Sequence, residues 1–163
     1  MKDDPDHWEA FADDPDDDYL DEDEGERCRA FIGHGRSLHW HVIERFLEKE
    51  LDVDTVEFGS ESRTGKHNVE VLEEMLGTSD IAIIVMTAED LTEDGSARAR
   101  QNVVHEAGLA QSHFGRERTV LLVQRGVELP SNLAGVQVLP FSGDSIEHCF
   151  EGLRRVLERE ELI

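Results

Sequence analysis

Ile81-Ala-Ile-Ile-Val-Met86 is the longest uninterrupted apolar run of the sequence, and it decides the fold. Six consecutive apolar residues, most of them β-branched, predict a strand that is buried on both faces. Such a strand is typical of a parallel sheet that helices cover on both sides. The run therefore predicts the central strand of an α/β domain.

Shorter apolar runs and amphipathic stretches alternate on both sides of this strand. Ser37 is expected to cap the first helix, whose apolar stripe begins at Leu38. About five alternations predict one doubly wound α/β domain, without an internal repeat or a second domain. The expected outer strands are 28–32, 53–58, 119–123 and 136–140, and the expected helices begin near residues 38, 69, 98 and 145.

The charge divides the chain into two parts. The 163 residues carry 16 Lys and Arg against 38 Asp and Glu, a formal net charge of −22. Residues 1–26 hold fourteen acids and one base, which predicts a disordered acidic tail, and residues 27–163 form the predicted domain. So negative a surface repels phosphate backbones, so we expect no nucleic-acid partner.

The sequence contains no apolar run near the roughly 18 residues that a membrane span needs. It also begins without an apolar signal segment, so we expect a cytoplasmic protein without a membrane partner. Its two cysteines, Cys28 and Cys149, are too few for a disulfide framework and predict reduced, mostly buried thiols. His105-Glu106 lacks the second histidine of a zinc-protease helix, so no metal site is expected.

Two segments attract attention as candidate binding or catalytic sites. Gly33-His-Gly35 follows the first strand, where backbone N–H groups either hold a phosphate or form a plain tight turn. On the helix that follows the central strand, Glu106 lies at the edge of the apolar stripe and one turn after Asn102. Glu106 is therefore either a functional, partly desolvated carboxylate or a boundary residue paired with an arginine such as Arg100.

Four stretches in order resemble the TIR-like predicted nucleotide-binding family, the TIR domains of bacterial cyclic-nucleotide anti-phage defence effectors. The resemblance extends over about 130 residues, between Cys28 and Arg159. The matching stretches are 31–36 (Phe-Ile-Gly-His-Gly-Arg), 84–90 (Ile-Val-Met-Thr-Ala-Glu-Asp), 99–109 (Ala-Arg-Gln-Asn-Val-Val-His-Glu-Ala-Gly-Leu) and 129–136 (Leu-Pro-Ser-Asn-Leu-Ala-Gly-Val).

The resemblance implies a flavodoxin-like TIR fold that cleaves the nicotinamide–ribose bond of NAD⁺ after the domains assemble. NAD⁺ is then a substrate, and no prosthetic group is expected. By position, Glu106 matches the catalytic glutamate. The expected nucleotide-binding residues are Gly33, His34, Gly35, Arg36, Asp90, Arg100 and Asn102, with Arg36 and Arg100 as contacts to the pyrophosphate.

The expected partners are NAD⁺ or a related nucleotide, other copies of the domain through TIR–TIR contacts, and an upstream sensor protein. Two other functions remain open. One is a non-catalytic module that binds nucleotides or associates through the loop Gly59–Lys66. The other is an enzyme that acts on the glycosyl bond of nucleosides, because nucleoside deoxyribosyltransferases share a related sheet and a catalytic glutamate.

The first prediction concerns salt. Lys2, Lys49 and Lys66 are the only lysines, and an acidic surface so poor in lysine is typical of a halophilic protein. At 1 M salt the Debye length falls to about 3 Å, which screens the repulsion among the acids. The melting temperature should therefore rise steeply from low salt to molar KCl, and an unchanged melting temperature would contradict the halophilic hypothesis.

Overall fold

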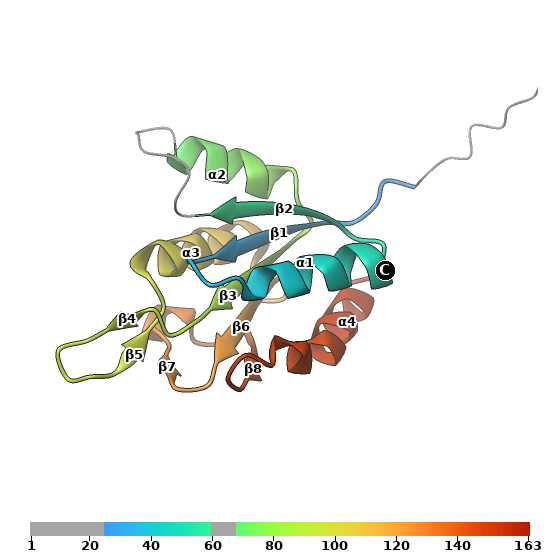
Figure 1. Cartoon of the computed structure of the whole chain (residues 1–163). Helices are drawn as coiled ribbons and strands as arrows, with labels where there is room; N and C mark the ends of the chain where they lie inside the picture. Colours follow the sequence, from blue (N-terminus) through green and yellow to red (C-terminus); the bar gives the residue numbers. More distant parts are fainter. Residues whose placement is uncertain (1–24, 60–67) are drawn as a thin grey trace, which may run out of the picture.

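A five-stranded parallel sheet forms the centre of the fold in the computed structural model, which describes residues 25–59 and 68–163. The strand order is β2-β1-β3-β6-β8 (Figure 1). The strands are β1 (Arg29–His34), β2 (Asp54–Gly59), β3 (Ile81–Met86), β6 (Thr119–Gln124) and β8 (Gln137–Phe141). The predicted flavodoxin-like α/β fold is confirmed. Nearly all of the acidic tail and of the loop Gly59–Lys66 lies outside the described residues.

The central run is confirmed as the inner strand of the sheet. All six residues of β3 are buried, and β3 pairs in parallel with β1 on one side and with β6 on the other. From β1 the chain continues to β2 at one edge of the sheet and then returns to β3 on the other side of β1. Sheets of this kind bind ligands where the strand order reverses, at the carboxyl ends of β1 and β3.

Two pairs of helices cover the two faces of the sheet (Figure 1). The helices α1 (His39–Glu50) and α4 (Phe150–Arg159) pack on one face, and α2 (Asn68–Gly77) and α3 (Gln101–Phe114) pack on the other. Alternate residues of each strand serve the two cores, so that Ile83 faces α1 and α4 while Ile84 faces α2 and α3. Both faces are therefore closed, and functional groups gather at the ends of the strands.

The first helix begins later than predicted. Its N-cap is Leu38 rather than Ser37, although the Ser37 hydroxyl accepts a long hydrogen bond from the His39 N–H at 3.4 Å. Leu38 is 71% exposed, so its assignment to the apolar stripe was also wrong. The residues of α1 that are buried against the sheet are Ile43, Phe46 and Leu47.

A second, smaller sheet explains another difference from the prediction. Helix α3 begins at Gln101 and not near Arg98, because Ala97–Arg98 forms the strand β5. This strand pairs with β4 (Asp90–Leu91) and with β7 (Val127–Glu128). The last predicted helix is divided into a 3₁₀ turn at Ile146–Cys149, followed by α4.

Three further findings concern the described part of the chain. None of its helices has the length and apolar character that crossing a membrane requires. Within the same residues, no group of three or more His, Cys, Asp and Glu is placed to bind a metal ion. Cys28 is half-buried and Cys149 is buried, both are free, and burial raises the pKa of each thiol to about 11.

Candidate functional site

The Glu106 carboxyl group lies against the carboxyl end of β1, where the strand order reverses. Glu106 belongs to the second turn of α3, and it is 1% exposed. An added Cβ at Gly33 would be 2.7 Å from Glu106 Oε2 and 2.8 Å from Ile84 Cδ1. Only a glycine in β1 leaves the space that this carboxyl group occupies. The structure therefore brings Gly33 and Glu106 together, although 73 positions separate them in the chain.

The Glu106 carboxyl group is unusual because it is buried without a hydrogen bond from the described residues. Neither Oε1 nor Oε2 has a hydrogen-bond partner among the described residues. Burial, and after it the negative charge of Glu57, raise the pKa of Glu106 from 4.5 to about 8. The interpretation of Glu106 as a boundary residue paired with Arg100 is thus wrong. With a pKa of about 8, the group is mostly protonated at pH 7.

Arg36, Asp90 and Arg100 also come together. With Glu89 they line a cavity of about 470 Å³ at the carboxyl edge of the sheet. Arg36 comes from the loop after β1, and Arg100 is the N-cap of α3. The first N–H groups of α3 add positive potential at this edge, so the cavity offers an anion two guanidinium groups and a helix N-terminus.

Glu89 is a site residue that the sequence-based prediction missed. Its carboxylate accepts a hydrogen bond from the Ser37 N–H at 2.8 Å. A Cβ on Gly35 would overlap the same carboxylate, so Gly35 allows the two loops to approach each other. Glu89 therefore fixes the loop that carries Arg36. Its position three residues after the central strand was a signal for such a role.

His34 and Asn102 are placed differently from the other predicted residues. The buried His34 ring stacks on Trp40, and its nitrogens hydrogen-bond to the Gly35 carbonyl and to Glu57, both at 2.7 Å. Its side chain is thus engaged on the β2 and α1 side of the loop. Asn102 is exposed on the first turn of α3 and lines neither this cavity nor the larger one beside it.

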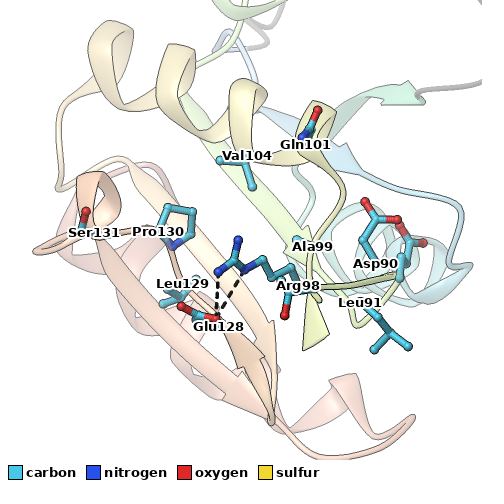
Figure 2. A pocket seen from close by; sticks show the side chains of 12 residues that line it. Asp90, Leu91, Arg98, Ala99, Gln101, Val104, Glu128, Leu129, Pro130 and Ser131 are labelled. Atoms are coloured by element: carbon cyan, nitrogen blue, oxygen red, sulfur yellow. Dashed lines mark hydrogen bonds and ion pairs between the residues drawn. The ribbon is translucent and has the colours of Figure 1, made fainter. Parts of the chain in front are cut away.

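The larger cavity, of about 1030 Å³, adjoins the first and shares Glu89 and Asp90 with it. It lies between the first turn of α3, the small sheet and the 3₁₀ turn at Ser131–Leu133 (Figure 2). Arg98 extends into it and pairs with Glu128, with 3.3 Å between Nη2 and Oε2.

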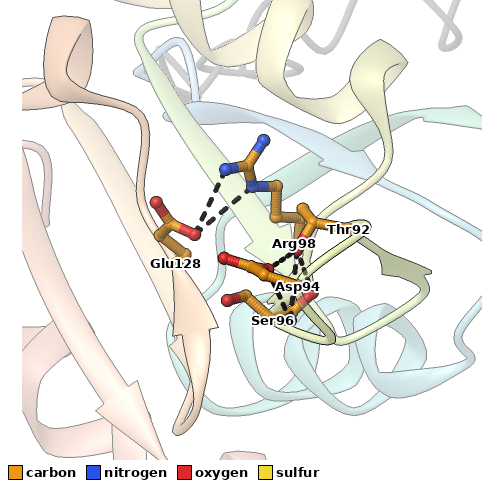
Figure 3. Close-up of polar contacts among 5 residues, drawn as sticks. All are labelled: Thr92, Asp94, Ser96, Arg98 and Glu128. Atoms are coloured by element: carbon orange, nitrogen blue, oxygen red, sulfur yellow. Dashed lines mark hydrogen bonds and ion pairs between the residues drawn. The ribbon is translucent and has the colours of Figure 1, made fainter.

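The β4–β5 hairpin at the rim of this cavity is held by a polar turn (Figure 3). Asp94 accepts hydrogen bonds from the Thr92 hydroxyl and from the Ser96 N–H, the latter at 3.0 Å. The hydrogen bond from Thr92 is the first cause that lowers the pKa of Asp94 to about 2, followed by those from Ser96. Asp94 thus stays ionised and holds the turn through the physiological range of pH.

Comparison with known proteins identifies a matching family. Residues 29–143 match the sequence profile of one family, which is described as "CAP12/Pycsar effector protein, TIR domain". The Pycsar effector protein PaPycTIR of Pseudomonas aeruginosa is 37% identical over 84 residues, which are 48% of this chain and 27% of that protein. CD-NTase-associated protein 12 of Sphingobacterium faecium is 26% identical over 110 residues, which are 66% of this chain and 33% of that protein.

This chain therefore spans about a third of the length of these curated relatives. Among solved structures, the lysine decarboxylase LdcF of Francisella novicida superposes with a TM-score of 0.50 at 11% identity. That match covers 83% of this chain and 18% of the decarboxylase, and it supports the fold alone.

The buried carboxyl group predicts a pH-dependent loss of stability. Because the pKa of Glu106 is about 8 in the folded state and about 4.5 when unfolded, the folded state holds its proton more firmly between these values. Stability from this proton is present below about pH 4.5 and is lost as the pH rises toward 8, by roughly 4 kcal/mol. Glu106→Gln should therefore gain stability relative to the wild type with rising pH in denaturant titrations, and parallel pH curves would contradict this.

The contact between Gly33 and Glu106 gives a second prediction. Gly33→Ala should lower the free energy of unfolding by about 1–3 kcal/mol, because the new methyl group overlaps the Glu106 carboxyl group and Ile84. In a Glu106→Ala background the loss should be smaller, which a double-mutant cycle measures. Gly77→Ala is the control, since a Cβ there meets no described atom within 4 Å. Equal losses in both backgrounds would refute the contact.

Proposed function

This chain belongs to the TIR domain family of CAP12/Pycsar effector proteins, and from that premise we propose that it cleaves the nicotinamide–ribose bond of NAD⁺. Glu106 is the proposed catalytic residue. The proposed setting is that of an effector in cyclic-nucleotide anti-phage defence, which the resemblance of the sequence implies. Two relatives are named as a Pycsar effector protein and a CD-NTase-associated protein.

The observation that carries the proposal is the buried carboxyl group of Glu106 without a hydrogen-bond partner. A residue kept for stability alone would be paired, because a buried carboxyl group without partners costs free energy. Strongly shifted carboxyl groups at the ligand-binding edge of a sheet are typical of catalytic sites. A cationic ligand supplies the favourable interaction that the Glu106 carboxylate does not receive from the described residues.

The nicotinamide ribose is such a ligand. Nicotinamide leaves NAD⁺ as a neutral molecule, so its departure needs no general acid, while positive charge develops on the ribose. A carboxylate beside the ribose stabilises this charge and accepts hydrogen bonds from the sugar hydroxyls. Arrival of the pyridinium cation lowers the pKa of Glu106, which then releases its proton and acts as the ionised form. Attack of Glu106 on the anomeric carbon is an alternative route with the same residue.

The pyrophosphate is assigned to the cavity lined by Arg36 and Arg100. Two guanidinium groups and the N-terminus of α3 bind a doubly charged group well. Glu89 keeps the loop that carries Arg36 in place, because its carboxylate accepts a hydrogen bond from the Ser37 N–H. Asp90, at the start of β4, is available for a sugar hydroxyl on the same cavity.

Association of several copies is part of the proposal. Glu106 is 1% exposed in the single chain, so the residues that cover its carboxyl group must move before the group can contact a ribose. Assembly of TIR domains, triggered by an upstream sensor, would supply that movement. The second candidate is a module that binds nucleotides without cleaving them. The burial of Glu106 favours this candidate for the unassembled chain.

The test is release of nicotinamide from NAD⁺ by concentrated protein in high salt. Glu106→Ala should reduce the rate by about 100-fold or more, because the developing charge loses its stabilising carboxylate. Glu151→Ala is the matched control, since its side chain is 65% exposed and lies on α4, which packs on the other face of the sheet. Equal rates for wild type and Glu106→Ala would remove Glu106 from the mechanism. Binding of NAD⁺ with no product from assembled protein would favour the binding module.

A further inference from the structure

We infer that the cavity beside the first turn of α3 is the subsite for the adenine base of the dinucleotide, an inference that rests on the proposed function. The cavity has a volume of about 1030 Å³, at the upper end of the range common for small-molecule sites. A nucleoside fits within it, and the adjoining cavity of about 470 Å³ is left for the phosphates.

The walls suit a flat heteroaromatic ring. Ala99 and Val104 line one side of the cavity, and Leu129 and Pro130 line the other (Figure 2). Between them lies the planar guanidinium group of Arg98. Guanidinium groups stack on nucleobases, and apolar side chains on two sides complete a slot for a ring.

The polar groups at the edge of the slot match those of a base. Glu128 holds the Arg98 guanidinium in place through Oε2, 3.3 Å from Nη2. Gln101 and Ser131 also line the cavity, and they supply donors and acceptors for ring nitrogens and an exocyclic amino group. Adenine offers both kinds of group on its edges.

The charge of the cavity disfavours phosphate. Its lining includes three acids, Glu89, Asp90 and Glu128, against the single base Arg98. The neighbouring cavity has Glu89 and Asp90 as well, but it adds Arg36 and Arg100 and lacks Glu128, so the phosphates of a ligand are better placed there. Since the two cavities share Glu89 and Asp90, one ligand extends from the arginines into the slot.

The geometry of α3 decides which end of NAD⁺ enters the slot. Val104 and Glu106 are two positions apart on the helix, so their side chains leave it about 200° apart. Val104 faces the slot, and Glu106 faces Gly33. The nicotinamide end belongs at Glu106, where its bond breaks. The adenine end is then left for the slot, with the pyrophosphate across the N-terminus of α3.

The experiment measures binding of ADP-ribose and nicotinamide mononucleotide by calorimetry to the full chain, assembled at high concentration in high salt. Val104→Trp and Ser131→Trp fill the slot, so each should weaken ADP-ribose binding by about 10-fold or more and leave nicotinamide mononucleotide unchanged. Ser131 is exposed, so its variant keeps the test valid if Val104→Trp fails to fold. Val138→Trp is the matched control, a partly buried valine lining a separate cavity near the amino end of β8.

Either of two results would overturn the adenine subsite. One is ADP-ribose binding that is the same in wild type and in a folded slot variant, and the other is no ADP-ribose binding by the wild type. Nicotinamide release is measured in parallel to separate the two proposals. Release by the wild type with unchanged ADP-ribose binding in the variants overturns the subsite alone. No release, with ADP-ribose binding lost in the variants, overturns the hydrolysis alone.

Discussion

A carboxyl group buried against the backbone of a strand is the constraint on which the functional edge of this molecule depends. Glu106 has no room beside β1 unless residue 33 lacks a side chain, since a Cβ there would be 2.7 Å from Oε2. The same glycine places α3 close to the reversal of strand order. Once α3 is fixed there, its N-terminus and Arg100 are fixed as well. One close approach thus sets the positions of the carboxyl group and of the anion-binding groups.

Three arginines lie at the same edge of the sheet, although the protein as a whole is strongly acidic. The chain carries a net charge of −22, yet Arg36, Arg98 and Arg100 all lie at cavities beside the N-terminus of α3. A polyanionic backbone is repelled by the protein as a whole, whereas a dinucleotide is small enough to experience mainly these local arginines. The acidic composition is therefore an argument against a nucleic-acid partner, and it remains compatible with a nucleotide ligand.

The sequence was a good guide wherever burial on two faces shaped it. The run Ile81–Met86 marks β3 at both ends because a strand covered on both sides has no polar residues. The small sheet was missed because strands of two residues carry no periodicity. Leu38 was misassigned because the helical period places it on the stripe, while the helix begins one residue later.

Some features of the candidate site could be predicted from the sequence, and others could not. Arg36, Asp90 and Arg100 were found from matching stretches, and their meeting follows from topology, since parallel strands bring their carboxyl ends to one edge. The full burial of Glu106 could not be found, because the helical period places it only at the edge of the apolar stripe. Gly33 is one of the residues that the buried carboxyl group lies against, and a single sequence holds no record of contacts at that separation.

Burial of Glu106 has a consequence for regulation that follows from energetics alone. The neutral acid is the stable form in the closed chain, because desolvation raises its pKa to about 8. In the proposed mechanism the active form is the anion, which is favoured when a cation or solvent reaches the group. In that mechanism, the event that exposes the Glu106 carboxyl group is therefore also the event that ionises it. Under the proposed function, the closed single chain therefore holds Glu106 in the protonated form, which does not stabilise a positively charged ribose.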